Sequence, residues 1–351
     1  MKADIQPQAK RYTATDRPKR SMKETWYREK QWSQWNLAQR LLFLVRLMPP
    51  KNALKPPHKE ATEPVGVFTE LAQWAFWFPL AATTPTLQYI YMKTTGETWS
   101  PFAAYCIYLF SFIVFSILTV QQLNRLGLKH GYFDSKHSRD GVPDQQSHTV
   151  LWSLTATVAF RPIVGFYFSY DRNELPWISP WFPLQAFAYA TTLDLFFYCY
   201  HRVMHEVPFL WKFHQRHHET HHPNALLSPF ADLEQDVFDI VVVPYLTFAT
   251  LPMNFHTFWM ISLGILYTEA AGHSGVRLYL PAPLTGYILR PLGMELALED
   301  HDIHHRHGWK DRGGNYGKQT RVWDFMFGTM RPRIETQWKQ VDWNNKVPMF
   351  G

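Results

Sequence analysis

Polar segments alternate along this chain with apolar stretches that are long enough to cross a lipid bilayer. Each stretch approaches the roughly 20 residues that a helix needs to span the hydrocarbon core. Four of them occur in the first 200 residues, approximately at Trp74–Met92, Phe102–Gln121, Leu151–Tyr170 and Pro183–Tyr200. The pattern predicts an all-α integral membrane protein with about four transmembrane helices. The alternative is a large soluble protein in which these helices are buried.

A second apolar pair follows, Val237–Leu251 and Phe255–Ala271, divided by the turn-forming residues 252–254. The pair predicts either one re-entrant hairpin or two further crossings. Both choices return His273 to the side of the membrane on which His201 lies.

The N-terminal region is strongly basic. Residues 1–60 carry 14 of the 35 Lys and Arg but only five of the 29 Asp and Glu, so the net charge of +6 arises there. Ser33–Met48 mixes Leu, Trp and Phe with Arg, as an interfacial amphipathic helix does. A basic arm favours the anionic cytoplasmic face of a membrane. No nucleic-acid recognition motif accompanies the charge, so we expect no nucleic-acid partner. Four crossings from a cytosolic N-terminus place His201 in the cytosol.

Histidines gather after the fourth apolar stretch. Residues 201–222 contain seven of the 17 histidines, residues 300–307 contain four, and His273 lies between these segments. Many are three or four residues apart, a spacing that puts side chains on one face of a helix. Neutral imidazole is the commonest metal ligand. The predicted ligands are His201, His205, His214, His217, His218, His273, His301, His304 and His305.

Nine imidazoles exceed what one ion holds, because zinc sites usually have four ligands and octahedral ions six. The spacing therefore predicts two metal ions in a cytosolic, histidine-rich helical cap. For His221, His222 and His307, outside the repeated pattern, supporting and surface roles both remain open. The isolated histidines are interpreted as ordinary core or surface residues; they are His58, His130, His137, His148 and His256.

Three ordered motifs carry a resemblance to a known family. They are H-x-x-x-H (His201, His205), H-x-x-H-H (His214, His217, His218) and a second H-x-x-H-H (His301, His304, His305). On a multi-span membrane protein they resemble the fatty acid hydroxylase/sterol desaturase superfamily. The motif N-Y-G followed by W-D-x-x-F-G-T, in residues 315–329, is also similar to that family. The resemblance covers roughly Pro183–Pro332.

The resemblance implies a non-haem di-iron enzyme that uses dioxygen to hydroxylate or desaturate an apolar lipid, such as a sterol, a terpenoid or a fatty-acyl chain. It also implies electrons from NAD(P)H, delivered by a reductase and a cytochrome b5-type carrier, and residence in the endoplasmic reticulum. We expect no catalytic side chains beyond the metal ligands and no nucleotide-binding residues. Two other classes stay open: a zinc-bound non-redox scaffold or isomerase-like relative, and a haem-binding electron carrier.

The chain departs from the family at one place. Many relatives carry His-Pro about a dozen residues after the middle histidine block, where this chain has Phe230–Glu234. We interpret this position as structural or substrate-related. Candidate carboxylates that could hold imidazole N–H groups are Asp194, Glu206, Asp300 and Asp302. A structural role is expected for Asn315, Tyr316, Trp323 and Asp324.

These observations divide the chain into four parts. They are a basic N-terminal region with an amphipathic helix (1–65), the transmembrane helices (66–200), the catalytic region (201–332) and a C-terminal tail (333–351).

Overall fold

A computed structural model describes residues 21–50, 53, 55–307 and 313–349. These residues are mostly helical, with one small sheet. Four long helices come first: α3 (Glu70–Thr95), α4 (Pro101–His130), α5 (Ser147–Ser169) and α6 (Phe182–Glu206). They contain the four predicted apolar stretches, so the prediction of a long helix at each is confirmed. By length and composition, α4 and α5 are able to cross a membrane.

Short polar side chains set the boundaries of these helices. Thr69 and Ser100 accept hydrogen bonds from the backbone N–H groups three residues ahead, at the starts of α3 and α4. Gly96 ends α3 with a φ of 72°, a left-handed conformation that glycine adopts without steric cost. The helix continues through Pro79 and Pro85. The prolines that blur the sequence pattern therefore do not divide α3.

Helix α10 (Phe255–Ser274) lies at the centre of the bundle. It packs against α3, α4, α5, α6 and α12, and 17 of its 20 residues are buried. A helix that is apolar on every side is a core element. It is preceded by one interrupted helix, made of α8 (Leu233–Val237), a π-helical turn (Phe238–Val242) and α9 (Val243–Thr250). The second apolar pair is therefore a hairpin of a broken helix and a long buried one.

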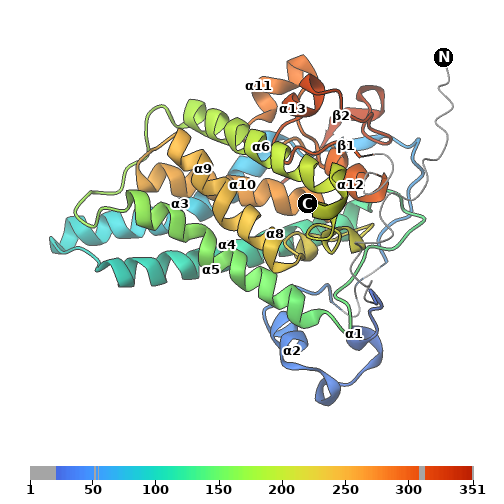
Figure 1. Cartoon of the computed structure of the whole chain (residues 1–351), viewed down its shortest axis with the longest axis horizontal. Coiled ribbons are helices and arrows are strands. Elements are labelled where there is room, and N and C mark those ends of the chain that lie inside the picture. Colours follow the sequence, from blue (N-terminus) through green and yellow to red (C-terminus); the bar gives the residue numbers. More distant parts are fainter. Residues whose placement is uncertain (1–20, 51–52, 54, 308–312, 350–351) are drawn as a thin grey trace.

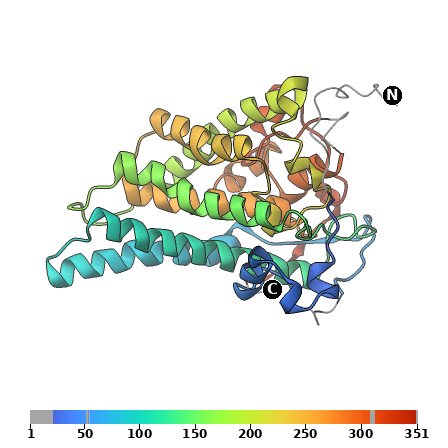
Figure 2. The same ribbon diagram turned by 60° about the horizontal axis from the view of Figure 1, so that its bottom comes forward.

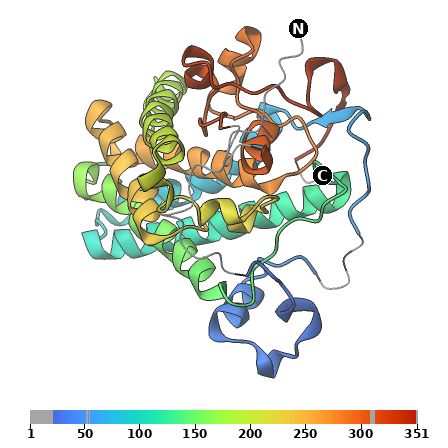
Figure 3. The same ribbon diagram turned by 45° about the vertical axis from the view of Figure 1, so that its right-hand side comes forward.

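The C-terminal segments gather over one end of the long helices, where α6 and α10 also end (Figure 1). They include α11 (Gly286–Leu289), α12 (Leu298–His307) and α13 (Val322–Met326). Strand β1 (Val65–Val67) pairs in parallel with β2 (Val341–Lys346), so the chain just before α3 is tied to the C-terminal part. Figure 3 brings this end of the molecule forward. Short helical turns complete the connections: α7 (Pro208–Trp211), η2 (His217–Glu219), η3 (Ala225–Leu227), η5 (Arg290–Leu292) and η6 (Trp338–Gln340).

Residues 21–50 form a small lobe below that end, drawn in blue in Figure 2. It contains α1 (Trp26–Glu29), a 3₁₀ turn (Trp32–Gln34) and α2 (Leu37–Leu44). The predicted amphipathic segment, residues 33–48, is therefore helical over a shorter range. Leu37 and Leu44 are 67% and 63% exposed, which leaves an apolar face on α2 without cover from the described residues.

Asp144 fastens this lobe to the loop before α5. Its carboxylate accepts hydrogen bonds from the Thr25 hydroxyl and from the backbone N–H groups of Thr25 and Trp26. The Lys30 ammonium lies 3.1 Å from the same carboxylate. Burial opposes ionisation, but these donors outweigh it and lower the pKa of Asp144 well below its ordinary value. The lobe is thus held by a carboxylate that is ionised at neutral pH.

Candidate metal centre

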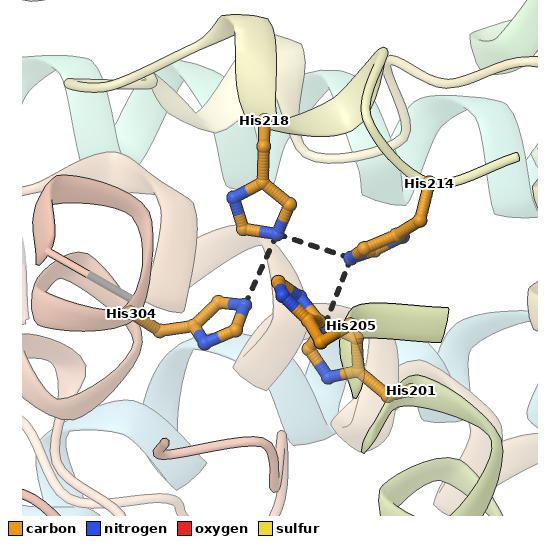
Figure 4. A group of neighbouring side chains, drawn as sticks. All are labelled: His201, His205, His214, His218 and His304. Atoms are coloured by element: carbon orange, nitrogen blue, oxygen red, sulfur yellow. Dashed lines mark hydrogen bonds between the residues drawn. The ribbon is translucent and has the colours of Figure 1, made fainter. Parts of the chain in front are cut away.

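Five imidazoles converge at the C-terminal end of α6. They belong to His201, His205, His214, His218 and His304, all buried (Figure 4). We call this group the five-histidine cluster. The Nε2 atoms face one another, with 2.9 Å between His201 and His214, 3.0 Å between His214 and His218, and 3.1 Å between His218 and His304.

Four more imidazoles converge beside them. His217, His273, His301 and His305, also buried, form the four-histidine cluster. The Nε2 atom of His273 lies 3.2 Å from that of His217 and 3.0 Å from that of His301. The two clusters are in direct contact, because the ring of His218 in one stacks on the ring of His305 in the other, with centroids 4.8 Å apart. All nine histidines that the sequence singles out are therefore gathered into two adjacent groups.

Three helices bring six of these side chains together from distant parts of the chain. His201 and His205 lie on the last turns of α6, His273 on the last turn of α10, and the third block on α12. Their spacing of three and four residues places them on one helix face, as expected.

The middle block differs from this expectation of a helix. Helix α7 ends at Trp211, and His214–His218 follow in turns and the 3₁₀ helix η2. The reason is local, since Pro208 starts a new short helix and the His217 N–H then bonds the His214 carbonyl three residues back. Neighbouring side chains diverge in so tight a turn, so His217 faces one cluster and His218 the other.

The second ring nitrogen of most of these histidines is already committed. Six Nδ1 atoms lie within hydrogen-bond distance of an oxygen. The pairs are His201 with Tyr316 O (2.8 Å), His214 with Gln235 Oε1 (2.8 Å), His217 with Phe230 O (3.1 Å), His273 with Glu269 O (2.7 Å), His304 with Gly314 O (2.8 Å) and His305 with Thr220 O (3.0 Å). Each oxygen only accepts, so each Nδ1–H donates, and the neutral ring keeps a lone pair on Nε2.

The facing nitrogens therefore cannot be joined by ordinary hydrogen bonds. In the pair His201 and His214, both Nδ1 atoms donate to oxygens, so neither Nε2 carries a hydrogen. The pair His217 and His273 has the same arrangement. Two lone pairs about 3 Å apart in a buried site repel each other unless a cation lies between them. The ring nitrogens are thus arranged as the ligands of a metal ion are.

The spacing also fits metal coordination. With metal–nitrogen bonds of about 2.1 Å, neighbouring ligands at right angles lie about 3.0 Å apart. The buried Nε2 of His305 has no hydrogen-bond partner among the described residues, although its Nδ1 does. Five nitrogen donors exceed the four that zinc usually takes, and match an ion with five or six ligands such as iron. The four-histidine cluster fits either zinc or iron with open positions.

Burial keeps these ligands uncharged. It lowers the pKa of His217 and of His218 well below the ordinary histidine value, and neighbouring histidines lower it further. It also lowers the pKa of His304 to about 4. A neutral imidazole is the form that binds metal, so these rings are ready to bind at neutral pH without losing a proton.

The candidate carboxylates do not hold the imidazoles, and that interpretation is wrong. Asp194 accepts from the N–H groups of residues 318–320, Glu206 pairs with Arg202, Asp300 with Arg333, and Asp302 with Arg139 and Arg306. Buried carboxylates need cations or several N–H donors to offset desolvation, and Asp194, Asp300 and Asp302 obtain them elsewhere, whereas Glu206 is exposed. Backbone carbonyls and one amide orient the imidazoles instead.

Asp194 nevertheless acts on the site through a loop. It binds Lys318–Thr320 while Asp324 accepts from the N–H groups of Tyr316 and Gly317, at 2.9 Å each. The carbonyl of Tyr316, which orients His201, is fixed between these two anchors. Trp323 donates from its indole N–H to the Thr191 carbonyl on α6. Tyr316, Trp323 and Asp324 thus make the contacts expected of a structural role.

Asn315 makes such contacts as well. Its side-chain amide donates to the Asp300 carbonyl and accepts from the Arg331 N–H, and its φ of 53° lies in the left-handed region. Asparagine tolerates that conformation better than most residues. The turn it makes places Gly314 O against His304 Nδ1.

Phe230–Glu234, where the chain departs from the pattern of the family it resembles, lies beside the histidine clusters and supports them. The Phe230 carbonyl accepts from His217, and Gln235, one residue after the segment, accepts from His214. Gln235 is the supporting residue that sequence reasoning missed. A glutamine 21 positions after its histidine carries no spacing signal.

The other described histidines lie outside both clusters. His222 has its Nε2 atom 3.0 Å from Asp134 Oδ2, and its ring stacks on His137 with centroids 4.9 Å apart. His58 lies beside Glu60 at the surface.

Comparison with known proteins agrees with the geometry. A family model described as fatty acid hydroxylase matches residues 186–329. The fatty acid hydroxylase vlmA of Lecanicillium sp is 43% identical over 244 residues, which are 65% of this chain and 66% of that protein. An alkylglycerol monooxygenase of Xenopus tropicalis is 28% identical over 53% of this chain and 40% of that protein. A Delta(7)-sterol-C5(6)-desaturase of Nicotiana tabacum is 26% identical over 48% of this chain and 57% of that protein.

The chain thus spans at most about two thirds of the length of these relatives. No solved structure is significantly similar to it. The matched region nevertheless contains all nine clustered histidines, together with Gln235 and the loop that orients His201. The chain belongs to the fatty acid hydroxylase/sterol desaturase superfamily.

Proposed function

We propose that this protein is a membrane-bound, dioxygen-dependent oxygenase that hydroxylates or desaturates an apolar lipid with two non-haem irons. One observation carries the proposal most directly. Nine buried imidazoles lie in adjacent groups of five and four, and in six of them a hydrogen bond donated by Nδ1 leaves Nε2 unprotonated. The named relatives are a hydroxylase, a monooxygenase and a desaturase, which supports redox chemistry on lipids.

The two clusters divide the nine ligands between the two irons. His201, His205, His214, His218 and His304 would hold one iron, and His217, His273, His301 and His305 would hold the other. Iron bound there would activate dioxygen, so that a hydrogen can be removed from an unactivated C–H bond. Hydroxylation consumes one O₂, two electrons and two protons, converts C–H to C–OH and releases one water. Desaturation with the same supply removes two hydrogens and releases two waters.

The protein itself provides ligand orientation and a dry site. Six of the rings donate from Nδ1–H to a carbonyl oxygen, which for His214 belongs to the Gln235 side chain. These hydrogen bonds fix the six rings and make their Nε2 atoms more basic. Burial of all nine rings excludes water from the metals. Two adjacent clusters leave open positions on the four-histidine side, where fewer ligands are present.

We propose that α3, α4, α5 and α6 all span the membrane, with the N-terminus and the histidines in the cytosol. Helices α3 and α6 have 26 and 25 residues, enough for about 30 Å of hydrocarbon. Large apolar side chains at their outer faces support lipid contact, among them Leu71 at 79% exposed and Leu184 at 59%. The basic residues 1–60 favour the cytosolic side, and the endoplasmic reticulum is the proposed compartment.

Electrons must come from another protein under this proposal. We propose NAD(P)H as their source, delivered by a reductase and a cytochrome b5-type carrier. The family resemblance is the support for this chain of donors.

A zinc-bound, non-redox scaffold or isomerase-like relative is the second candidate. The four-histidine cluster favours it, since four nitrogen donors are the usual set for structural zinc. Zinc has no redox chemistry, so the two candidates differ in oxygen uptake.

The test is a reconstituted assay under ¹⁸O₂. The iron-loaded, full-length protein in lipid vesicles receives NADH, a cytochrome b5 and its reductase, and a panel of fatty-acyl and sterol lipids. The oxygenase proposal expects oxygen uptake coupled to one lipid, with ¹⁸O in an alcohol product or a new double bond. Oxygen uptake no greater than that of a His217→Ala variant, with every lipid recovered unchanged, contradicts it.

A further inference from the structure

A small cavity with an unusual wall lies beside the four-histidine cluster. It measures about 70 Å³ and is enclosed by α4, α5, the π-helical turn and α10. Glu269, which lines it, lies one helical turn before His273 and orients that ligand through its carbonyl. Lys318, which also lines it, follows the loop that orients His201. The cavity therefore adjoins the residues that hold the metal ligands.

The lining combines apolar side chains with five charged ones. Arg161 on α5 lies 2.8 Å from the Glu269 carboxylate on α10, and both side chains are largely buried. Asp236, Asp239 and Lys318 complete the charged set. Charges buried in an apolar bundle are costly, and an apolar pair of similar volume often serves stability as well. Stability alone therefore gives no reason for these charges at this place.

Several hydrogen-bond donors around the cavity are unused. The Thr119 hydroxyl is buried, with the residue 1% exposed, and has no hydrogen-bond partner among the described residues. The Nη1 atom of Arg161 is committed to the Glu269 carboxylate at 2.8 Å, which leaves the other N–H groups of the guanidinium as donors. The Lys318 ammonium lies 3.6 Å from Asp239, longer than a hydrogen bond, and over the Phe197 ring. Buried donors without a partner are suited to bind a ligand that accepts hydrogen bonds.

The charge balance narrows the choice of acceptor. Arg161 and Lys318 face Glu269 and Asp239, and burial raises the pKa of the third carboxyl group, Asp236, to about 7. No surplus positive charge is therefore available to a carboxylate ligand. An uncharged oxygen, as in an ester, ketone, ether or alcohol, accepts from Thr119 and Arg161 without such a charge. The volume of about 70 Å³ holds a small group of atoms and not a polycyclic body, since one water needs about 10–15 Å³ of a cavity measured in this way. The cavity therefore suits the polar end of a lipid better than a polycyclic body.

We propose that this cavity binds an uncharged oxygen of the lipid substrate, with Thr119 and Arg161 as hydrogen-bond donors. The inference rests on the proposed function, because it assigns the substrate class of the same site. It deepens that function by predicting a linear lipid with a neutral oxygen-bearing end.

The experiment measures equilibrium binding to metal-loaded, unreduced full-length protein, so no turnover is needed. The probes are radiolabelled methyl tetradecanoate, tetradecanoate and pentadecane. The wild-type protein is expected to bind the ester more tightly than either of the others. Thr119→Val keeps the side-chain shape but removes the donor, and should weaken ester binding about fivefold while leaving pentadecane unchanged.

Thr157→Val is the matched control. Thr157 lines the same cavity, but its hydroxyl already donates to the Ser153 carbonyl at 2.8 Å. Its substitution should leave the ratio of ester to alkane affinity unchanged. The double variant Arg161→Gln/Glu269→Gln, which removes both charges without leaving one unpaired, should lower that ratio further.

Equal binding of ester and pentadecane by the wild type overturns the proposal, even if a variant fails to fold. So does a Thr119→Val protein that binds the ester as wild type does, or that loses ester and alkane equally. Failure of the oxygenase proposal looks different. In that case the ester preference and its loss in Thr119→Val persist, but reduction of the loaded protein with the ester gives no oxygen uptake.

Discussion

Replacing Gln235 by Met should loosen the metal in the five-histidine cluster without removing any ligand. The Gln235 Oε1 atom accepts from His214 Nδ1 at 2.8 Å, and its amide donates to Asp239 at 3.2 Å. Methionine has a similar volume but offers only a weak acceptor. The His214 ring then loses the contact that fixes its proton on Nδ1 and points Nε2 into the cluster.

Two independent considerations give the same magnitude. Loss of a partner that orients a metal-binding histidine typically lowers metal affinity by about 10- to 100-fold. At 1.4 kcal/mol per decade this equals about 1.4–2.8 kcal/mol. A buried N–H group left without an acceptor costs about 1–3 kcal/mol. Both figures describe the same His214 N–H, so they should not be added.

The assay follows metal loss during competition with a chelator, with iron counted per chain at each chelator concentration. Gln235→Met should lose one iron at about 10- to 100-fold lower chelator concentration, and the second iron as the wild type does. Gln88→Met is the control, because Gln88 is buried and hydrogen-bonded to Tyr108 and Tyr170. The histidine beside it, His256, lies outside both clusters. It should lower thermal stability but leave metal retention unchanged. The reasoning is refuted if both variants lose stability equally and both retain two irons as the wild type does.

Three further predictions concern the supports of the site. Asp324→Asn weakens the anchor of the Tyr316 and Gly317 N–H groups, so it should lower the unfolding free energy by about 1–3 kcal/mol in denaturant titration; an unchanged midpoint would contradict this. Because the pKa of Asp144 is lowered far below its ordinary value in the folded protein, the stability it contributes is fully present above about pH 4 and is lost progressively as pH falls toward the folded-state pKa. Limited proteolysis should then cut near residue 30 faster at pH 2 than at pH 4 in the wild type, and fast at both pH values in Asp144→Ala. Cutting of the wild type that does not depend on pH would count against the anchor. Removal of metal should lower the melting temperature, because ligands that bind only the folded state stabilise it. A melting curve that stays unchanged after a chelator has removed the metal would contradict this stabilisation by metal.

The helices and the ligands could be predicted from the sequence because each has a local signal. Apolar stretches placed the ends of α3, α5 and α6 within six residues, although α4 runs on to His130 and not only to Gln121. Histidines three or four apart identified the faces of α6 and α12 that carry the clusters. The grouping of His217 with His273 and His301 could not be predicted, since it depends on how α10 and α12 pack. Sequence order places His217 beside His218, yet the tight turn sends them to different clusters.

The supporting contacts were predicted poorly for a physical reason. Carboxylates are the side chains one expects beside a metal-binding histidine, so Asp194, Glu206, Asp300 and Asp302 were natural candidates. The structure uses backbone carbonyls, which every residue has and which leave no mark in a sequence. The carboxylates instead bind cations and loop N–H groups, because these compensate buried charge more fully than a neutral imidazole does.

The central claim is that the nine histidines hold two irons, and one measurement tests it most directly. It is iron content together with the Mössbauer spectrum of protein purified anaerobically after growth with ⁵⁷Fe, beside a His217→Ala variant. The account predicts about two irons per chain with the spectrum of a spin-coupled pair after oxidation, and loss of that coupling in the variant. Tightly bound zinc that persists after iron-replete expression, with no coupled iron in the wild type, would contradict it.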